Sequence, residues 1–462
     1  MTTIRLQLVI PFHQPLCAGE DELDKKCEQG YAPLIEAIEG CTAQVALHFT
    51  GHLLDHLSHR RSEILWRIKS LVQNGRAEVL GGLFYGAAPT LIPEIDVRGQ
   101  IEMMTEYWES AAGVTPAGFW LHQLAWTPDM PRLLAETGLE YGFAARSQVR
   151  APQGAAGPFG IVERGGQRLG VFVLDPELSS ALPSKSVDAW LEAVLSAAQD
   201  QPLTNVWVRA ETLAAADPTW LGEWLQALSS RTETVLPAQS FADLRPAERL
   251  MLVPGLAPEI AGAEDTLYRR MLRVSDKLRE TIDTMEENGT ESEWSDSLAT
   301  AQRMVFATQV ADAYWRSRNP GSGDTALRDA VAERLIKAET LIDQLLQGED
   351  DWIAAEEQDR DADLADEVFV GNRYLTLWLV PAAGGVIRTL DDRATGRNVL
   401  DAGGERNGIR ERLVAAGGPE GLLSEGVDTI EEIEIGRNEI DEEGDGTYHL
   451  AVRHRLEAGG AV

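Results

Sequence analysis

The first 210 residues alternate between short strand-like runs and amphipathic helical segments. Strands that alternate with helices form parallel βα units. At least four such units precede residue 150 and further strand-like runs follow, so a closed α/β barrel is favoured over an open doubly wound sheet. No glycine-rich dinucleotide fingerprint accompanies them. The clearest strand-like runs are 4–10, 42–51, 76–86, 170–175 and 205–210, and the clearest helical segments are 52–75, which is expected to end at Gly75, and 96–113.

Three further segments follow the predicted barrel at 1–258. Residues 259–348 hold long helical segments without intervening strands, which predicts a helical bundle domain. Residues 349–366 are strongly acidic and predict a solvated connector. Residues 367–462 contain runs of alternating apolar and polar residues that are separated by glycine-rich turns, which predicts antiparallel β structure. Because this last segment has fewer than a hundred residues and ends in a strand-like run, its sheet is expected to be abbreviated.

The net charge of the chain excludes some classes of binding partner. Lys and Arg total 41 against 74 Asp and Glu, a formal net charge of −33. A field of this sign repels phosphate backbones and anionic lipids, so neither nucleic acid nor a membrane is an expected partner. No cleavage-site pattern or membrane-spanning run occurs, so a cytoplasmic location is expected. The sequence leaves the oligomeric state open.

Two patterns suggest metal ligands, but each has a simpler interpretation. DRDAD at 359–363 has the alternating carboxylates of a calcium loop, yet Leu364 and Val370 replace the glycine and glutamate that such a loop needs. Four histidines at helical spacing cross a predicted strand–helix boundary without a supporting Cys or carboxylate pattern. The sequence therefore predicts no metal and no cofactor. The histidines are His48, His52, His56 and His59, and the three cysteines, expected as free thiols, are Cys17, Cys27 and Cys41.

Two short stretches place polar side chains at predicted strand ends. FHQP at 12–15 supplies an imidazole and an amide, with an ordinary turn as the alternative interpretation. GFWLHQLAW at 118–126 surrounds His122 and Gln123 with three aromatic rings. Because α/β barrels carry their ligand groups at the carboxyl ends of strands, both stretches are candidate site segments.

Motifs spread over nearly the whole chain occur in an order that resembles glycoside hydrolase family 57. They include FHQP (12–15), ALHFTG (46–51), EVLGGLFYG (78–86), GFWLHQLAWTPDMPRLLAETGLEY (118–141), RRMLRVSDKL (269–278), DAYW (312–315) and EVFVGNRYLTLWLVP (367–381). The resemblance implies a seven-stranded (β/α) barrel, a helical domain and a C-terminal β-sandwich of the kind found in the family's α-amylase and 4-α-glucanotransferase members. The sandwich is expected to be partial at 367–462.

The same resemblance implies that the catalytic carboxyls are missing. The family acts on α-glucans by a retaining mechanism, which needs a carboxylate nucleophile and a carboxylic acid. The nucleophile is the glutamate of a Trp-Leu-Ala-Glu tetrad, and here residues 120–123 read Trp-Leu-His-Gln. An Asp-Asp-Gly-Glu stretch carries the acid, and if Glu211 matches its glutamate, Val208 and Arg209 occupy the aspartate positions. An amide such as that of Gln123 cannot form a glycosyl ester.

Further departures point the same way. Pro11 stands at the first His of a doubled-His motif, Gly86 where a glutamate follows Phe-Tyr, and Arg316 where a histidine follows DAYW. The first hypothesis is a non-catalytic homologue that binds α-glucan or maltooligosaccharide, or has a structural or partner-binding role. An alternative within this hypothesis is that the cleft binds nothing and that its tryptophans are residues of the hydrophobic core. The expected binding residues are His13, His48, Trp120, His122, Gln123, Trp126, Asp312 and Trp315.

The rival hypothesis is an active 4-α-glucanotransferase or α-glucan hydrolase with relocated carboxylates. Two substitutes would have to converge at about 5 Å, the spacing of a retaining pair. The candidates near predicted strand ends are Glu94, Asp96, Asp129, Asp175, Glu177 and Glu211.

Overall fold

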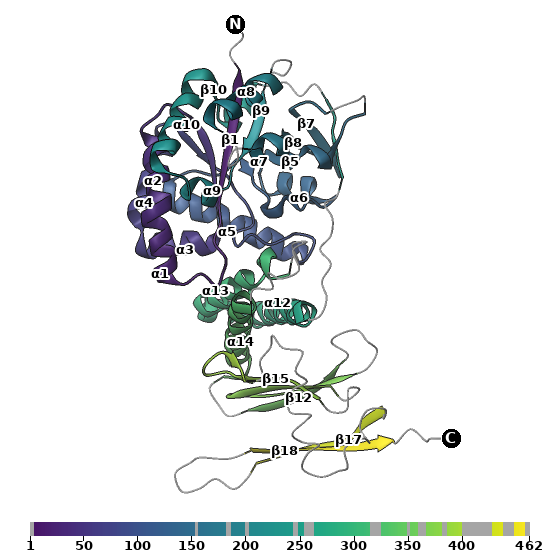
Figure 1. Ribbon diagram of the computed structural model, residues 1–462. Helices are drawn as coiled ribbons and strands as arrows, with labels where there is room; N and C mark the ends of the chain where they lie inside the picture. The colour runs from purple at the N-terminus through teal and green to yellow at the C-terminus, as the bar shows by residue number, and fades with distance from the viewer. Residues whose placement is uncertain are drawn as a thin grey trace, which may run out of the picture. The chain divides into compact units, whose positions relative to one another are not determined.

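Figure 1 shows the computed structural model of the chain. It divides into two compact units, one of Met1–Glu259 with Gln309–Ser322 and one of Ile260–Thr308 with Gly323–Val462. The structure describes residues 4–152, 156–181, 186–198, 203–243, 248–253, 263–314, 325–348, 352–358, 366–380, 386–399, 427–437 and 448–457. Within these ranges no helix is long and apolar enough to cross a membrane.

Seven parallel strands form the centre of the first unit. β1 pairs with β2, β2 with β3, β4 with β5, β5 with β8, and β9 with β1. A bridge from Gly81 to Phe119 joins β3 to β4, and a 2.9 Å hydrogen bond from Asp175 N to Asn205 O joins β8 to β9. These contacts run through all seven strands and return to β1, which confirms the predicted α/β fold class. The strands are β1 (Arg5–Phe12), β2 (Val45–Phe49), β3 (Ala77–Val79), β4 (Gly118–Phe119), β5 (Tyr141–Ala145), β8 (Gln167–Leu174) and β9 (Thr204–Trp207).

Shorter strands extend this arrangement. β7 (Phe159–Arg164) pairs antiparallel with β8, and β10 (Glu233–Thr234) pairs parallel with the first residues of β1. β6 (Val149–Arg150) and β11 (Met251–Leu252) form a separate antiparallel pair.

Helices lie around the strands of the first unit, as Figure 1 shows. Their apolar residues face inward; Ile64, Ile68 and Leu71, for example, are the buried residues of α4. The helices are α1 (Glu20–Lys26), the π-helix η1 (Cys27–Tyr31), α2 (Ala32–Glu39), α3 (Gly51–Arg60), α4 (Ser62–Gln73), α5 (Glu94–Ala112), α6 (Met130–Glu136), α7 (Pro176–Ala181), α8 (Val187–Ala197), α9 (Ala210–Ala214), α10 (Pro218–Arg231) and α11 (Pro237–Asp243).

The helix predicted at 52–75 is in fact two helices, α3 and α4, with a break at Arg61. This residue takes φ −136° and ψ 42°, outside the helical region. Its guanidinium donates to Asp24 of α1 and Glu28 of η1 at 2.9 and 2.5 Å. The apolar spacing continues across the break, so the sequence pattern does not reveal it. Gly75 follows α4 with φ 66°, a left-handed conformation that glycine adopts without strain.

Aromatic side chains fill much of the barrel centre. Tyr141, Phe143 and Phe172 are fully buried and pack in one cluster with Trp120. The carboxyl group of Glu78, on β3, contacts this cluster through Tyr141. The Tyr141 hydroxyl and the Ala238 backbone N–H both donate to its carboxyl group. Burial raises the pKa of Glu78 to about 7, although these two hydrogen bonds oppose the rise.

We expect Glu78→Gln to stabilise the protein relative to wild type at pH above 7. In wild type the folded state keeps a proton that the unfolded chain, with a pKa near 4.5, has released, so stability falls as pH rises from about 4.5 to 7. The difference should reach about 1–3 kcal/mol above pH 7 and vanish below pH 4.5. Chemical denaturation over a pH series measures it. Glu102→Gln, at an exposed position of α5, is the matched control, and a pH-independent difference would contradict the assignment.

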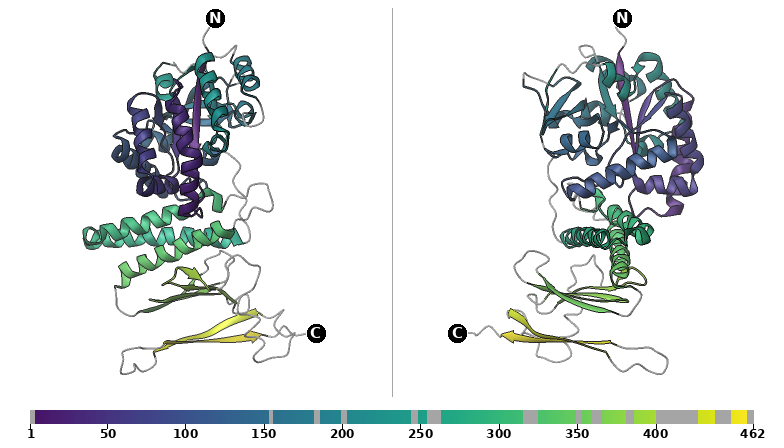
Figure 2. Two further views of the ribbon diagram at one scale, coloured as in Figure 1. Left: turned by 60° about the vertical axis from the view of Figure 1, so that its left-hand side comes forward. Right: turned by 180° about the vertical axis from the view of Figure 1, so that it is seen from behind.

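The second unit combines three helices with antiparallel strands. α12 (Ala263–Asn288), α13 (Glu291–Thr308) and α14 (Thr325–Gln347) pack against one another, as the green helices of Figure 2 show. One antiparallel sheet contains β12 (Ile353–Gln358), β13 (Glu367–Asn372), β14 (Leu375–Val380), β15 (Val386–Asp392) and β16 (Arg397–Asn398). β17 (Val427–Arg437) and β18 (Tyr448–Glu457) form an antiparallel pair. The helical and β segments were both expected from the sequence.

Part of the predicted acidic connector is a strand. β12 lies within residues 349–366 and pairs antiparallel with β13 along its whole length. Glu356 and Glu357 are exposed at this edge of the sheet, where charged side chains are tolerated. High charge is thus compatible with an edge strand, and the expectation of a solvated connector was wrong for 353–358. The possible calcium loop at 359–363 lies outside the described residues.

A buried ionic network connects the helices and the sheet of the second unit. Arg270 of α12 lies 2.8 Å from Glu339 of α14 and 2.7 Å from Asp391 of β15. All three side chains are less than a tenth exposed. Next to them, Arg393 lies 2.7 Å from Asp343 of α14. Charges this deeply buried are tolerated only because each has a partner.

Candidate functional site

Three loops bring together polar residues at the carboxyl ends of β1 and β4. His13 follows β1, and His122 and Gln123 lie in the 3-10 turn η2 (His122–Leu124) after β4. Asp312 comes from the turn η5 (Ala311–Ala313), which is remote in sequence but belongs to the first unit. A bridge from Ala87 to Val310 and a 3.2 Å hydrogen bond from Ala311 N to Gly86 O hold that turn against the barrel.

Asp312 is the centre of this cluster. Its Oδ2 lies 2.5 Å from His13 Nε2, and its Oδ1 lies 3.4 Å from His122 Nε2. The Gln123 amide donates to Oδ1 at 3.2 Å. The two imidazole rings lie 4.4 Å apart between centroids, and Thr50 Oγ1 lies 3.1 Å from His13 Nδ1. Three predicted binding residues, His13, His122 and Gln123, therefore meet at the carboxylate of a fourth, Asp312.

The backbone at η2 is strained. Gln123 and Leu124 adopt φ values of 59° and 51°, the described non-glycine residues with positive φ. The left-handed region costs a side-chain-bearing residue about 1–2 kcal/mol. Residues held in this way cluster at functional sites, because packing and hydrogen bonds must compensate for the strain. In this conformation the exposed Gln123 side chain donates to Asp312.

The charges of the cluster are set by its surroundings. Burial raises the pKa of Asp312, but hydrogen bonds from His122 and His13 outweigh it and hold that pKa far below its usual range. Burial and the neighbouring His13 lower the pKa of His122 despite its contact with Asp312. At neutral pH Asp312 is therefore an ionised carboxylate and His122 a neutral imidazole.

Comparison with known proteins identifies the family. The model of glycosyl hydrolase family 57 matches residues 15–249, half of the chain. The chain belongs to this family. An α-amylase from Pyrococcus abyssi is 24% identical over 91% of this chain and 69% of its own length. One from Pyrococcus horikoshii is 30% identical over 41% of this chain and 30% of its own length.

Solved structures of the family share the fold. The 4-α-glucanotransferase from Thermococcus litoralis aligns with a TM-score of 0.68 at 22% identity, over 87% of this chain and 68% of that chain. The α-amylase AmyC from Thermotoga maritima aligns with a TM-score of 0.62 at 14% identity, over 76% of this chain and 95% of that chain. These likenesses confirm the fold class implied by the motifs.

Within this family-57 barrel, several predicted binding residues are part of the core. Trp126 is completely buried and its indole N–H donates to Phe143 O at 3.0 Å. Trp120 is 4% exposed and His48 is 1% exposed. Burial lowers the pKa of His48 to about 3, so this ring is neutral. These three side chains are buried in the structure, and the binding role expected for them stays a prediction. Trp315 lies outside the described residues.

The resemblance assigns the family's acid to the positions of Val208 and Arg209, and neither residue is a carboxylate. Val208, after β9, is buried, and Arg209 is exposed. Glu211 lies in the first turn of α9, and its Oε1 accepts a 2.9 Å hydrogen bond from His13 N and a 2.8 Å bond from the Tyr31 hydroxyl. Glu211 thus helps to fix the loop that carries His13.

The other replacement carboxylates are spread over different local environments. Glu94 and Asp129 form ion pairs on the surface, with Arg98 and Arg132 and with Arg164. Asp96 accepts a 2.5 Å hydrogen bond from Gln309. Asp175 caps the backbone of α7, and Glu177 is exposed. Asp312, which the sequence suggested only as a binding residue, is the carboxylate in contact with Gln123.

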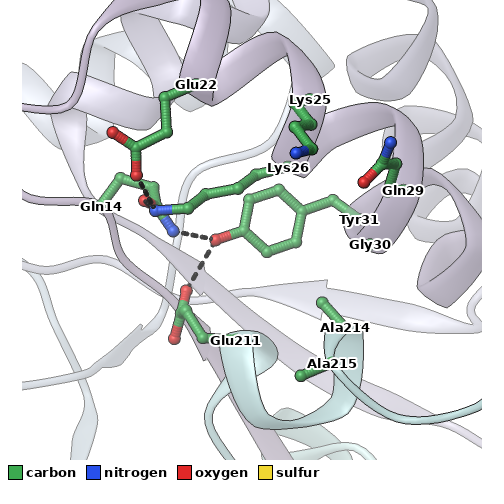
Figure 3. A pocket seen from close by; sticks show the side chains of 10 residues that line it. All are labelled: Gln14, Glu22, Lys25, Lys26, Gln29, Gly30, Tyr31, Glu211, Ala214 and Ala215. Atoms are coloured by element: carbon green, nitrogen blue, oxygen red, sulfur yellow. Dashed lines mark hydrogen bonds and ion pairs between the residues drawn. The ribbon is translucent and has the colours of Figure 1, made fainter.

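A pocket of about 460 Å³ lies beside Glu211 (Figure 3). Lys26 Nζ donates to Gln14 Oε1 at 2.7 Å, and the Gln14 amide donates to the Tyr31 hydroxyl at 2.5 Å. The Tyr31 hydroxyl in turn donates to Glu211 Oε1. Gln14 is part of the FHQP motif, but Lys26 and Tyr31 have no sequence signal that marks them. The lining residues are Gln14, Glu22, Lys25, Lys26, Gln29, Gly30, Tyr31, Glu211, Ala214 and Ala215.

Proposed function

We propose that this family-57 member is a non-catalytic cytoplasmic protein that binds α-glucan at the carboxyl end of its barrel. The observation that carries the proposal is Gln123. It occupies the position that the Trp-Leu-Ala-Glu tetrad assigns to the nucleophile, and its amide donates to Asp312. A neutral amide neither attacks an anomeric carbon to form a glycosyl ester nor stabilises an oxocarbenium-like transition state by its charge.

The acid positions support the same proposal. Val208 has an aliphatic side chain, and Arg209 carries a guanidinium group in place of a carboxyl group. The carboxylate close to Gln123 is Asp312, whose low pKa keeps it ionised and therefore unable to donate a proton to a leaving oxygen. A retaining mechanism needs one carboxyl of each kind.

The binding part of the proposal rests on exposed groups near the cluster. Gln123 and Arg209 are exposed and offer hydrogen bonds to sugar hydroxyls. Trp207, at the end of β9, is partly exposed and lies 6.5 Å from Trp120 between ring centroids. It supplies a stacking face in place of the buried Trp120 and Trp126.

We expect maltoheptaose to bind the wild-type protein and Trp207→Ala to weaken that binding at least about tenfold, or 1.4 kcal/mol. Isothermal titration calorimetry measures the affinity. Trp66→Ala is the matched control, because Trp66 is 70% exposed on α4, away from the strand ends, and its loss should leave the affinity unchanged.

Two outcomes of the same experiment separate the alternatives. An absence of binding at millimolar maltoheptaose would refute a glucan site and favour a structural or partner-binding role. Chromatography of the incubated sugar tests the other alternative. Shorter or redistributed chains would show that relocated carboxylates keep the protein active as a hydrolase or glucanotransferase.

A further inference from the structure

We propose that His13, His122 and Asp312 form a binding site for a divalent transition-metal ion of the Zn²⁺ class. Each residue offers one ligand atom, and the three atoms lie within 4.8 Å of one another. Two imidazole nitrogens and one carboxylate oxygen are a donor set that Zn²⁺ accepts, with a fourth position open for water or another ligand. Hard cations such as Ca²⁺ and Mg²⁺ prefer sites built from oxygen alone.

A neighbouring hydroxyl group orients the His13 ring. Thr50 Oγ1 contacts Nδ1 of His13 at 3.1 Å, which orients the ring with Nε2 toward Asp312. Such second contacts fix ring orientation in metal sites.

The second imidazole is supplied by a departure of this chain from its family motif. His122 stands where the Trp-Leu-Ala-Glu tetrad has alanine, directly before the lost nucleophile. The same short loop therefore loses a carboxylate and gains an imidazole next to Asp312. The sequence predicted no metal because the donors show no local spacing: 299 residues separate His13 from Asp312, and 190 separate His122 from Asp312.

The proposal is independent of glucan binding, since it concerns only the three donors. Zn²⁺ affinity is measured on tag-free, chelator-stripped protein by competition with a chromophoric chelator. We expect one Zn²⁺ per chain in wild type and no comparable binding of Mg²⁺ or Ca²⁺. His122→Ala, which restores the tetrad's alanine, and Asp312→Asn should each weaken Zn²⁺ binding at least about tenfold. Circular dichroism verifies that both variants are folded.

Two control variants exclude other ligands. His59→Ala removes an exposed histidine of α3, and a Cys17→Ser/Cys41→Ser double variant removes the two partly exposed thiols. Both should bind Zn²⁺ like wild type. The proposal is overturned if wild type binds no Zn²⁺, if a control variant loses the binding, or if folded His122→Ala and Asp312→Asn bind as tightly as wild type. A failure of maltoheptaose binding leaves the Zn²⁺ result unaffected, so the two proposals are distinguishable.

Discussion

Arg270→Ala is expected to lower the free energy of unfolding of the second unit by about 3–5 kcal/mol, because it leaves buried carboxylates without their cation. Arg270 contacts Glu339 and Asp391, whose side chains are 4% and 1% exposed. The loss of packing by the long arginine stem adds to the effect. Chemical denaturation of the full chain, followed by circular dichroism, measures the change.

Because this effect is electrostatic, it should change how the free energy of unfolding depends on pH. Burial raises the pKa of Glu339, but the attraction of Arg273 and Arg270 outweighs it and holds that pKa well below its usual value. A lowered carboxyl pKa contributes stability above the unfolded pKa of about 4.5, and this contribution is lost as pH falls below that value. Arg270→Ala should therefore lose less stability on acidification than wild type.

Arg279→Ala is the matched control on the same helix. Arg279 pairs with Asp276 one turn away, and both side chains are at least 40% exposed. Exposed pairs of this kind contribute about 0.2–1 kcal/mol. If Arg270→Ala destabilised the chain no more than Arg279→Ala, the buried network would not be the stabilising element that its geometry indicates.

The sequence predicts the elements of the fold better than their boundaries. Strand and helix alternation, the helical region and the β region were all expected and confirmed, because each depends on local apolar spacing. The break at Arg61 and the strand at 353–358 were missed. Both depend on tertiary contacts, namely the ion pairs of Arg61 with α1 and η1 and the pairing of β12 with β13. Local patterns carry no record of such partners.

The candidate site is likewise predictable from the sequence in its residues but not in their contacts. His13, His122 and Gln123 were predictable from strand-end motifs, and Asp312 from its family motif. That the first three contact the carboxylate of Asp312 follows only from the fold. The fold brings the turn that holds Asp312, nearly 300 residues from His13 in sequence, next to the end of β1. The aromatic residues show the limit of the approach. A tryptophan in a motif gives the same sequence pattern whether it faces a ligand or the core, and only the structure shows that Trp120 and Trp126 are buried.

Gln123→Glu alone is expected to leave maltooligosaccharide turnover at background. The change restores the carboxylate that the tetrad requires, but under the proposed function the acid that must protonate the leaving oxygen is still missing. General acid–base catalysis contributes about 10²–10⁴-fold, so the variant should stay at least that far below an intact carboxyl pair. Chromatography of maltoheptaose products measures the rate, with the Thermococcus litoralis 4-α-glucanotransferase as the positive control and Gln123→Ala as the matched negative control.

The contacts of Gln123 add a second reason for this outcome. Its amide now donates to Asp312 at 3.2 Å, and a glutamate there would replace the donor with a second carboxylate. Two neighbouring carboxylates raise the pKa of one of them, which opposes the ionised form that a nucleophile needs. Relative to wild type, the variant should therefore be destabilised more at neutral pH than near pH 4. Robust turnover by Gln123→Glu would instead show that an acid is present near Arg209 or elsewhere at these strand ends, and loss of that turnover in Glu211→Gln or Asp312→Asn would identify it.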